Sequence, residues 1–266
     1  MEKFPKYFLS FFILVIVSNM QAQVNCNSVE GGNCRKACEI YNKATVSQGS
    51  RSSQESFDKA IALCSTFSNA YMEKSVPYLK RGDFITWKSL IDKAVDMNPK
   101  MHLPYRAWCK FQFLRDYNGA LADFDELEKL GLNLNGYFSQ NGDYNLEIVK
   151  AICYSGLGQK ERAISIIEKQ LSTKDYNVGL YDYYHLGATY FDVRKYDQAL
   201  ENFERQSKYN DFAENIYYKS KIAKIRNKDY LDLKKIALQR YDAGKNMKDV
   251  YTHHFNKIYR VQILEL

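Results

Sequence analysis

Proline and glycine are scarce in this sequence. Four prolines and thirteen glycines are spread over 266 residues. The long intervals between them are rich in Ala, Leu, Lys, Glu, Gln and Ile, residues that favour helix over strand. A hydrophobic share of 45% with 26% charged residues is typical of a folded chain. The composition therefore excludes disorder throughout and favours a helical fold.

Apolar runs long enough to span a bilayer are also missing. The run from Phe8 to Val17 is broken only by Ser10, whereas a transmembrane helix needs about 20 apolar residues. This run follows Lys3 and Lys6 and precedes the small residue Ala22, the order found in secretory signals. We therefore predict a signal peptide over residues 1–22, no membrane span after its cleavage, and a periplasmic or extracellular protein. A membrane anchor is the alternative.

Catalytic and metal-binding motifs are absent from the sequence. The four histidines are His102, His185, His253 and His254, and none belongs to the H-E-x-x-H motif of zinc proteases. No phosphate-binding G-x-x-x-x-G-K-[ST] run and no G-x-S-x-G elbow occurs. A cysteine-dependent enzyme with Cys109 or Cys153 as nucleophile is the remaining catalytic alternative. We predict a protein that is not an enzyme and needs neither cofactor nor metal.

A concentrated basic strip is missing as well. The net charge is +7, but the lysines are spread along the chain and do not form the basic, aromatic strip that follows a phosphate backbone. We therefore expect no nucleic-acid partner.

Helical periodicity is clearest in YHLGATYFDVRKYDQALENF, residues 184–203. Leu186, Gly187 and Tyr190 share one helix face, and Ala199 and Phe203 share a face of a second helix. The position of Ala199 recurs backwards along the chain at intervals of 36, 43, 33 and 34 residues. The recurring positions are Ala163, Ala120, Trp87 and Ser53. In the same register, a second column consists of Phe57, Ile91, Phe124, Ile167 and Phe203, and a first-helix column of Ala44, Tyr78, Phe111, Tyr154 and Tyr190.

This pattern resembles the tetratricopeptide repeat family, whose unit is a helix–turn–helix of about 34 residues. The resemblance implies an all-α fold, a right-handed α-solenoid of stacked helical hairpins. We expect a cysteine-containing tail over residues 23–35, about five repeats and a degenerate sixth over residues 36–241, and a C-terminal capping helix over residues 242–266. The 43-residue interval contains residues 131–145, read either as a surface insertion or as a small hairpin that contacts a ligand.

The resemblance also implies a groove lined by the first helices of the repeats. The residues expected there are aromatic and aliphatic: Met72, Val76, Tyr105, Cys109, Phe113, Ile148, Ile152, Tyr181, Tyr184, Phe191 and Tyr218. Tyrosine is favoured at interfaces. We therefore predict a non-catalytic scaffold of the cell envelope that binds a peptide segment or partner protein, of unassigned oligomeric state. An envelope glycan-binding solenoid is the alternative, and packing between repeats competes with a binding role at each position.

Four cysteines lie near the N-terminus: Cys26, Cys34, Cys38 and Cys64. Their spacing has no Cys-x-x-Cys pair and no nearby histidine, which argues against zinc. In an exported protein they are expected to form disulfides. With Cys38 early in the first helix of repeat one and Cys64 at the end of its antiparallel partner, we predict Cys38–Cys64 and Cys26–Cys34 bridges.

Overall fold

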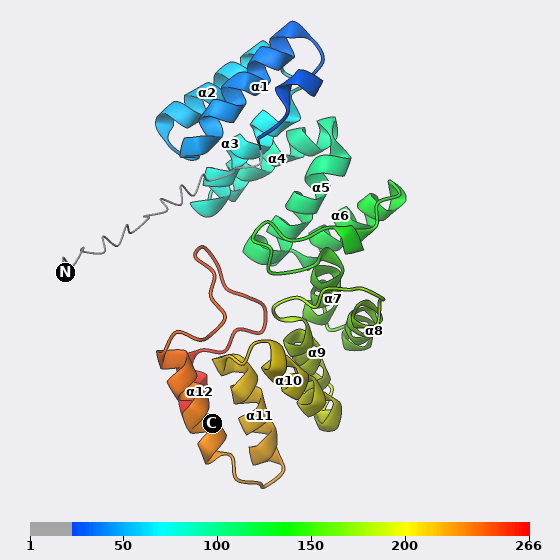
Figure 1. The fold of residues 1–266 in the computed structure, drawn as a ribbon, viewed down its shortest axis with the longest axis vertical. Coiled ribbons are helices and arrows are strands. Elements are labelled where there is room, and N and C mark those ends of the chain that lie inside the picture. The colour runs from blue at the N-terminus through cyan, green and yellow to red at the C-terminus, as the bar shows by residue number, and fades with distance from the viewer. Residues whose placement is uncertain (1–22) are drawn as a thin grey trace, which may run out of the picture. The chain divides into compact units, whose positions relative to one another are not determined.

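The computed structural model describes residues 23–266, so the predicted signal peptide lies outside the described residues. Within this range the chain forms α-helices and no β-strand (Figure 1). It divides into two compact units, one ending at Ala70 and one running from Tyr71 to Leu266. The α-helices are α1 (Gly32–Ala44), α2 (Arg51–Leu63), α3 (Ser68–Lys80), α4 (Phe84–Met97), α5 (Pro99–Cys109), α6 (Tyr117–Lys129), α7 (Leu146–Gly156), α8 (Lys160–Leu171), α9 (Asp182–Asp192), α10 (Tyr196–Tyr209), α11 (Ala213–Ile225), α12 (Leu231–Asp242) and α13 (Arg260–Glu265).

Successive helices pack as antiparallel pairs. Helix α1 packs on α2, α5 on α6, α7 on α8, α9 on α10 and α11 on α12. In the second unit each pair also contacts the next, through α4 and α5, α6 and α7, α8 and α9, and α10 and α11. The predicted succession of helix pairs is therefore present in the described chain.

The repeated sequence positions form the core of these pairs. All members of the two second-helix columns are buried: Ser53, Trp87, Ala120, Ala163, Ala199, Phe57, Ile91, Phe124, Ile167 and Phe203. Small residues in one column let two helices approach, and the large residues of the other fill the space between pairs. The period read from the sequence therefore marks the packing interface of the structure.

Polar side chains fix several helix starts. The carboxylate of Asp83 accepts a hydrogen bond from the backbone nitrogen of Thr86 at 3.0 Å, and Asp116 does the same for Gly119 at 2.8 Å. Asn145 caps α7 through the nitrogen of Glu147 at 2.9 Å. These side chains occupy donors that a helix N-terminus leaves unpaired.

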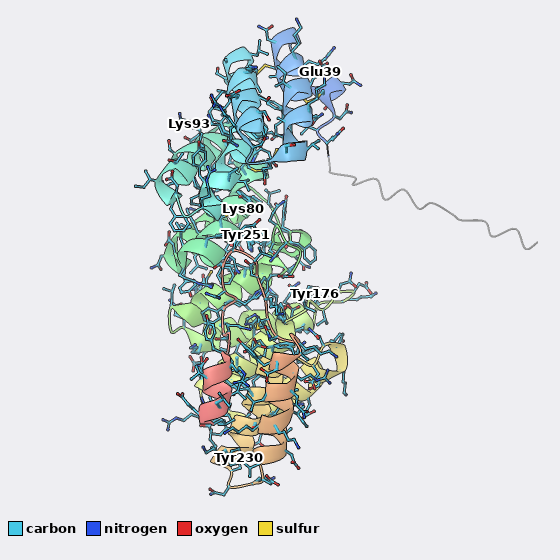
Figure 2. The ribbon with its side chains drawn as sticks, turned by 90° about the vertical axis from the view of Figure 1, so that its left-hand side faces the viewer. Glu39, Lys80, Lys93, Tyr176, Tyr230 and Tyr251 are labelled. Carbon is cyan, nitrogen blue, oxygen red and sulfur yellow. A yellow bond between two sulfur atoms is a disulfide. The ribbon has the colours of Figure 1, made fainter. Side chains whose placement is uncertain are left out.

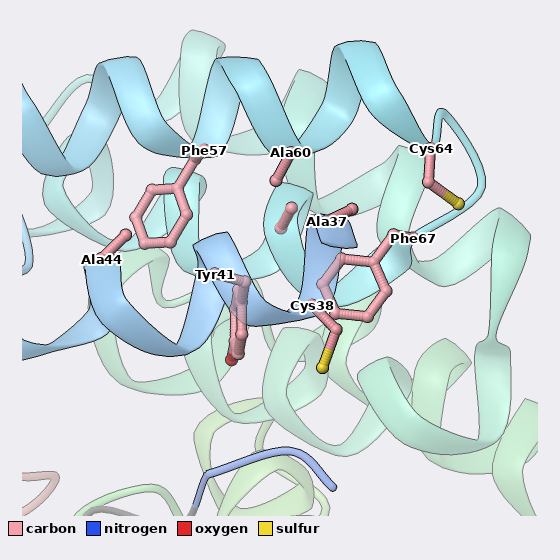
Figure 3. Close-up of a cluster of buried hydrophobic side chains, with 9 residues drawn as sticks. Ala37, Cys38, Tyr41, Ala44, Phe57, Ala60, Cys64 and Phe67 are labelled. Atoms are coloured by element: carbon pink, nitrogen blue, oxygen red, sulfur yellow. The ribbon is translucent and has the colours of Figure 1, made fainter. Parts of the chain in front are cut away.

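The unit ending at Ala70 has its own aromatic core. The ring of Tyr41 lies 5.9 Å from that of Phe57 and 5.5 Å from that of Phe67, between α1 and α2 (Figure 3). The chain before α1 returns to this helix, because the backbone nitrogen of Val24 donates to the Asn42 side chain at 3.1 Å and the Asn42 amide donates to the Val24 carbonyl at 2.8 Å.

All four N-terminal cysteines are paired in disulfides, but the predicted pairing is wrong. The bridges are Cys26–Cys38 and Cys34–Cys64. The error comes from the start of the first helix: α1 begins at Gly32, not near residue 36, so Cys34 is the residue in its first turn. Cys34 therefore meets the end of antiparallel α2 at Cys64, while Cys38, one turn later, meets the returning tail at Cys26.

The predicted C-terminal capping helix is wrong over most of its length. Residues 243–259 contain turns and bends but no helix, and only α13, Arg260–Glu265, is helical. The chain leaves the helical conformation at Gly244, with a φ of 74°, and again at Asn256, with a φ of 60°. Glycine and asparagine are the residue types that adopt such positive φ values, which an α-helix does not contain.

Substitution of Gly187 by Ala should destabilise the second unit, since a Cβ at this position would lie 2.7 Å from the Phe203 ring. We expect a loss of about 1–3 kcal/mol in the free energy of unfolding, the usual effect of overpacking a dense core. Gly136→Ala is the matched control, because its Cβ would meet nothing within 4 Å. Urea unfolding of both variants measures the effect, and equal stability of Gly187→Ala and wild type would contradict the packing described above.

Peptide mapping under non-reducing conditions should recover Cys26 linked to Cys38 and Cys34 linked to Cys64. Loss of the second bridge should be the more destabilising change, because it spans 30 residues against 12. A chain-entropy model gives about 3.5 kcal/mol for the longer loop and about 3 kcal/mol for the shorter. Recovery of a Cys38–Cys64 peptide would overturn this assignment.

Candidate functional site

The first helices of the second unit share one face, and part of the chain itself lies on it. We call this the first-helix face; it is formed by α3, α5, α7, α9 and α11 of residues 71–266 with the turns beside them. The C-terminal segment, Ala243–Tyr259, leaves α12 and returns to α13 as the orange-to-red loop of Figure 1. The contacts of residues 251–257 run in chain order, from Tyr251 beside Lys80 of α3 (Figure 2) to Lys257 beside Glu214 of α11.

At the α11 end, the segment supplies a cation to a buried carboxylate. Glu214 is fully buried in the first turn of α11, and its carboxylate receives the ammonium of Lys257 and the backbone nitrogen of Met247 at 3.1 Å. The same ammonium donates to the Met247 carbonyl at 2.6 Å. Burial raises the pKa of Glu214, and the Lys257 charge acts in the opposite direction. The carboxylate is therefore dependent on the segment for its counter-charge.

At the centre, the segment inserts the His254 ring among tyrosines. The Tyr144 hydroxyl lies 2.7 Å from Nδ1 of His254, and Nε2 lies 3.0 Å from the Lys248 carbonyl. Because a carbonyl can only accept, Nε2 donates to it, and in the neutral ring Nδ1 then accepts from Tyr144. The ring centroid of Tyr181 lies 5.2 Å from that of His254. Two hydrogen bonds and the contact with the Tyr181 ring therefore fix the position of the His254 ring.

Tyr144 comes from the 131–145 insertion, which is more than a surface elaboration. The nitrogen of Ser139 donates to the Tyr144 carbonyl at 2.8 Å, and an antiparallel bridge joins Phe138 to Asn145. This small hairpin buries the Tyr144 side chain completely, against the rings of His185 and His254. Residues 131–145 therefore contain a small hairpin, and its contact is with the protein's own C-terminal segment; a ligand contact of this hairpin stays a prediction.

Main-chain groups of the segment are also bound. The Tyr184 hydroxyl donates to the Asn256 carbonyl at 2.5 Å, and the Arg115 guanidinium donates to the His253 carbonyl. In the reverse sense, the Thr252 hydroxyl donates to the Gln112 carbonyl at 3.0 Å. Gln112 belongs to a π-helical turn, Lys110–Leu114, a feature that often occurs at functional sites.

His185 lies beneath these contacts on α9. Its ring centroid is 5.4 Å from that of Tyr184 and 6.4 Å from that of Phe255 of the segment. It is fully buried, and neither ring nitrogen has a hydrogen-bond partner within residues 23–266. Burial lowers its pKa to about 3, with a further contribution from His254. His185 is therefore held neutral at ordinary pH.

The predicted groove positions fall into two groups. Seven are buried: Val76 on α3, Cys109 on α5, Ile148 and Ile152 on α7, Tyr181 directly before α9, Tyr184 on α9 and Tyr218 on α11. Met72, Tyr105, Phe113 and Phe191 stay partly exposed. Of the buried ones, Tyr181 and Tyr184 contact the C-terminal segment. Tyr218 packs between repeats, with its ring stacked 5.2 Å from that of Phe203.

Several residues of this site were missed by sequence reasoning. Glu214, Tyr144, His185 and Arg115 are polar groups scattered over more than 90 residues, and no short motif links them. The segment itself had a detectable signal, because GKNMKDVYTHHFN combines Gly, Asn, Asp and Thr at a density that opposes a continuous helix.

The two free thiols are unsuited to nucleophilic chemistry. Cys109 and Cys153 are both fully buried, and burial raises the pKa of each thiol. The thiolate is the reactive form of cysteine, so these environments oppose it. Within residues 23–266, no cluster of three or more His, Cys, Asp or Glu side chains is placed to hold a metal ion.

None of the helices in the described part of the chain has the length and apolar character needed to cross a membrane.

Solved structures with a similar arrangement of helices include a tetratricopeptide repeat protein. No protein-family model matches the sequence, and no curated protein matches it in sequence. The structure of PilW, a widely conserved type IV pilus biogenesis factor, aligns with a TM-score of 0.63 at 14% identity over 80% of this chain and 96% of PilW. A tetratricopeptide repeat protein from Parabacteroides merdae ATCC 43184 aligns with a TM-score of 0.57 at 16% identity over 80% and 79% of the two chains.

A third structure, the MamA RS-1 ArsTM double mutant, aligns with a TM-score of 0.54 at 13% identity over 68% of this chain and 96% of MamA. At these identities the comparisons establish the fold. The protein is an all-α solenoid of the tetratricopeptide type, as the sequence resemblance predicted.

Acidification should destabilise the fold through His185. Its folded-state pKa, about 3, lies below the ordinary value of 6.5, so between these values the unfolded chain binds more protons and stability falls as the pH falls. At pH 5 this residue lowers the free energy of unfolding by about 2 kcal/mol relative to pH 7.5.

His185→Phe should remove this share of the pH dependence, whereas His253→Phe, at an exposed position, should retain it. Thermal or urea unfolding at pH 7.5 and pH 5.0 gives the comparison. Parallel pH dependence of the His185→Phe and wild-type chains would show that His185 is not buried in its neutral form.

Proposed function

We propose that this protein is a non-catalytic scaffold of the cell envelope whose first-helix face binds a non-helical segment of a partner protein. The observation that carries the proposal is the C-terminal segment itself. Seven consecutive residues, 251–257, contact this face, each through its side chain or its carbonyl. A face that holds one peptide segment by such contacts has the chemistry to hold another.

The types of contact fit peptide recognition. Tyr184 and Arg115 donate to main-chain carbonyls, interactions that are available to any peptide. Specific recognition then comes from pockets for side chains, here the Tyr144–Tyr181 ring site and the Glu214 carboxylate. Burial raises the pKa of Tyr184 well above its ordinary value, so the hydroxyl stays a donor at any physiological pH. Tyr105 and Phe113, which are predicted for the same groove, are partly exposed.

Export is supported by the cysteines and by the N-terminal sequence. Two disulfides stabilise the unit ending at Ala70, and such bridges persist in oxidising compartments. Charged, apolar and small residues follow one another over residues 1–22 in the order of a secretory signal. PilW, one of the similar structures, is a pilus biogenesis factor. We therefore assign the scaffold to the periplasm or the cell exterior.

Glycan binding, the alternative function, has less support from the arrangement of the aromatic residues. Stacking on a sugar needs an accessible ring beside polar groups, and the stretch YDYYHLGATYFD, residues 181–192, combines aromatic rings with Asp. Tyr181, Tyr184 and Tyr190 of this stretch are buried, which leaves Tyr183 and Phe191 as its partly exposed rings. The cysteine-dependent alternative is disfavoured by the burial of both free thiols.

Photo-cross-linking from the first-helix face tests the scaffold function. A benzophenone amino acid at Phe113, partly exposed on this face, should give a discrete cross-linked protein in intact envelopes. The same probe at Ser165, exposed on second helix α8, should not, because it lies on another element. Equal products from both positions, or glycan conjugates without protein at Phe113, would contradict the proposed function.

A further inference from the structure

The C-terminal segment is attached to the rest of the second unit in a way that allows release. It contains no helix or strand, and at its tip Val250 is 88% exposed and Tyr251 54% exposed. Its hydrogen bonds to the rest of the second unit combine side-chain and main-chain groups, including one from the Ala213 nitrogen to the Lys245 carbonyl at 2.9 Å, but they form no β-ladder. Of residues 243–259 only Met247, His254 and Ile258 are buried, and segments with few buried contacts open at low free energy compared with the core. Gly244, with a φ of 74°, supplies a flexible joint directly after α12.

Release would leave Glu214 without its cation. The side chain is fully buried, and Lys257 is the only cation that forms an ion pair with it among the described residues. An unpaired charge in such a site is strongly unfavourable. An occupant that replaces the segment must therefore bring a Lys or Arg side chain to the start of α11, and a neutral or acidic occupant would be rejected.

Release would also expose a site for a ring. Tyr144 needs a hydrogen-bond acceptor where Nδ1 of His254 now lies, at 2.7 Å, and Tyr181 offers an aromatic wall. The unpartnered imidazole of His185 lies next to both, with ring centroids 5.6 Å and 6.5 Å away. An imidazole or another ring with an acceptor atom satisfies these groups, whereas an aliphatic side chain leaves the Tyr144 hydroxyl unpaired.

We propose that the C-terminal segment is an internal competitor that occupies the first-helix face, and that it shows the chemistry of the external ligand. That ligand is a non-helical peptide segment with a Lys or Arg three residues after a histidine or similar ring. The spacing is that of His254 and Lys257, which reach the ring site and Glu214 together. This inference rests on the proposed scaffold function and specifies its partner.

The test uses the full mature chain and a fluorescein-labelled peptide with the protein's own residues 247–259, MKDVYTHHFNKIY. Fluorescence anisotropy measures its binding. Wild type should bind it weakly, because the face is occupied. Lys257→Met in the chain weakens the internal segment and should tighten peptide binding by about tenfold or more, the effect expected when one partner of a buried charge pair is removed.

Two substitutions test the charge requirement. A peptide with Lys257→Met should bind the Lys257→Met chain about tenfold or more weakly than the unaltered peptide. In a chain that carries both Glu214→Gln and Lys257→Met, the two peptides should bind equally. Thr252→Val is a second way to loosen the segment, because it removes only the hydrogen bond to the Gln112 carbonyl, and it keeps the test usable if Lys257→Met fails to fold.

The outcomes separate the inference from the function beneath it. The internal-competitor proposal is overturned if the peptide binds wild type as tightly as it binds the Lys257→Met and Thr252→Val chains. It is also overturned if the peptides with and without the lysine bind the Lys257→Met chain equally. A concentration-dependent dimer of the loosened chains that excludes the peptide would make a second copy the occupant, and this too overturns it. A cross-linked partner at Phe113 together with peptide failure would leave the scaffold function standing alone.

Discussion

A helical hairpin has more apolar surface than its two helices can cover for each other, and the rest of this structure depends on how that surface is covered. Neighbouring pairs cover most of it, with Phe124, Ile167 and Phe203 fully buried at successive interfaces. The small residues between them set the spacing, since Gly187 leaves no room for a Cβ beside Phe203. Within residues 71–266 each helix pair is therefore stabilised by its neighbours, and the first helices of these pairs form the first-helix face.

The first-helix face is rich in tyrosine and carries the buried carboxylate of Glu214. These polar groups need partners, as the apolar surface needs neighbouring helices. The hydroxyls of Tyr144 and Tyr184 and the carboxylate of Glu214 are buried away from water, so each needs a hydrogen-bond or ion-pair partner from the protein. The C-terminal segment supplies such partners through His254, the Asn256 carbonyl and Lys257. These are polar contacts made by a segment without secondary structure, so each one fixes a particular residue of the segment on the face. Under the internal-competitor proposal, another peptide can replace the segment, whereas the stacked helices cannot be replaced.

The fold was predictable from the sequence because the residues that pack its helices recur along the chain. Ala120, Ala163 and Ala199 recur at intervals of 43 and 36 residues, the longer of which contains the 131–145 insertion, and each is fully buried. Two elements escaped this reasoning for physical reasons. The disulfide partners depend on a single helical turn, since a start at Gly32 in place of residue 36 exchanges Cys34 and Cys38. The occupant of the face depends on contacts over 110 residues, between Tyr144 and His254, for which no local pattern exists.

Transfer of residues from the family resemblance reached some positions of the first-helix face and missed others. Family resemblance placed Tyr181 and Tyr184 on the first-helix face, and the segment contacts both. It gave no indication of Tyr144, which is carried by an insertion of this chain, or of Glu214, at the first turn of a degenerate repeat. A shared scaffold fixes which positions lie on the first-helix face. The insertion and the last repeat, which depart most from the family pattern, supply polar groups that bind the C-terminal segment there.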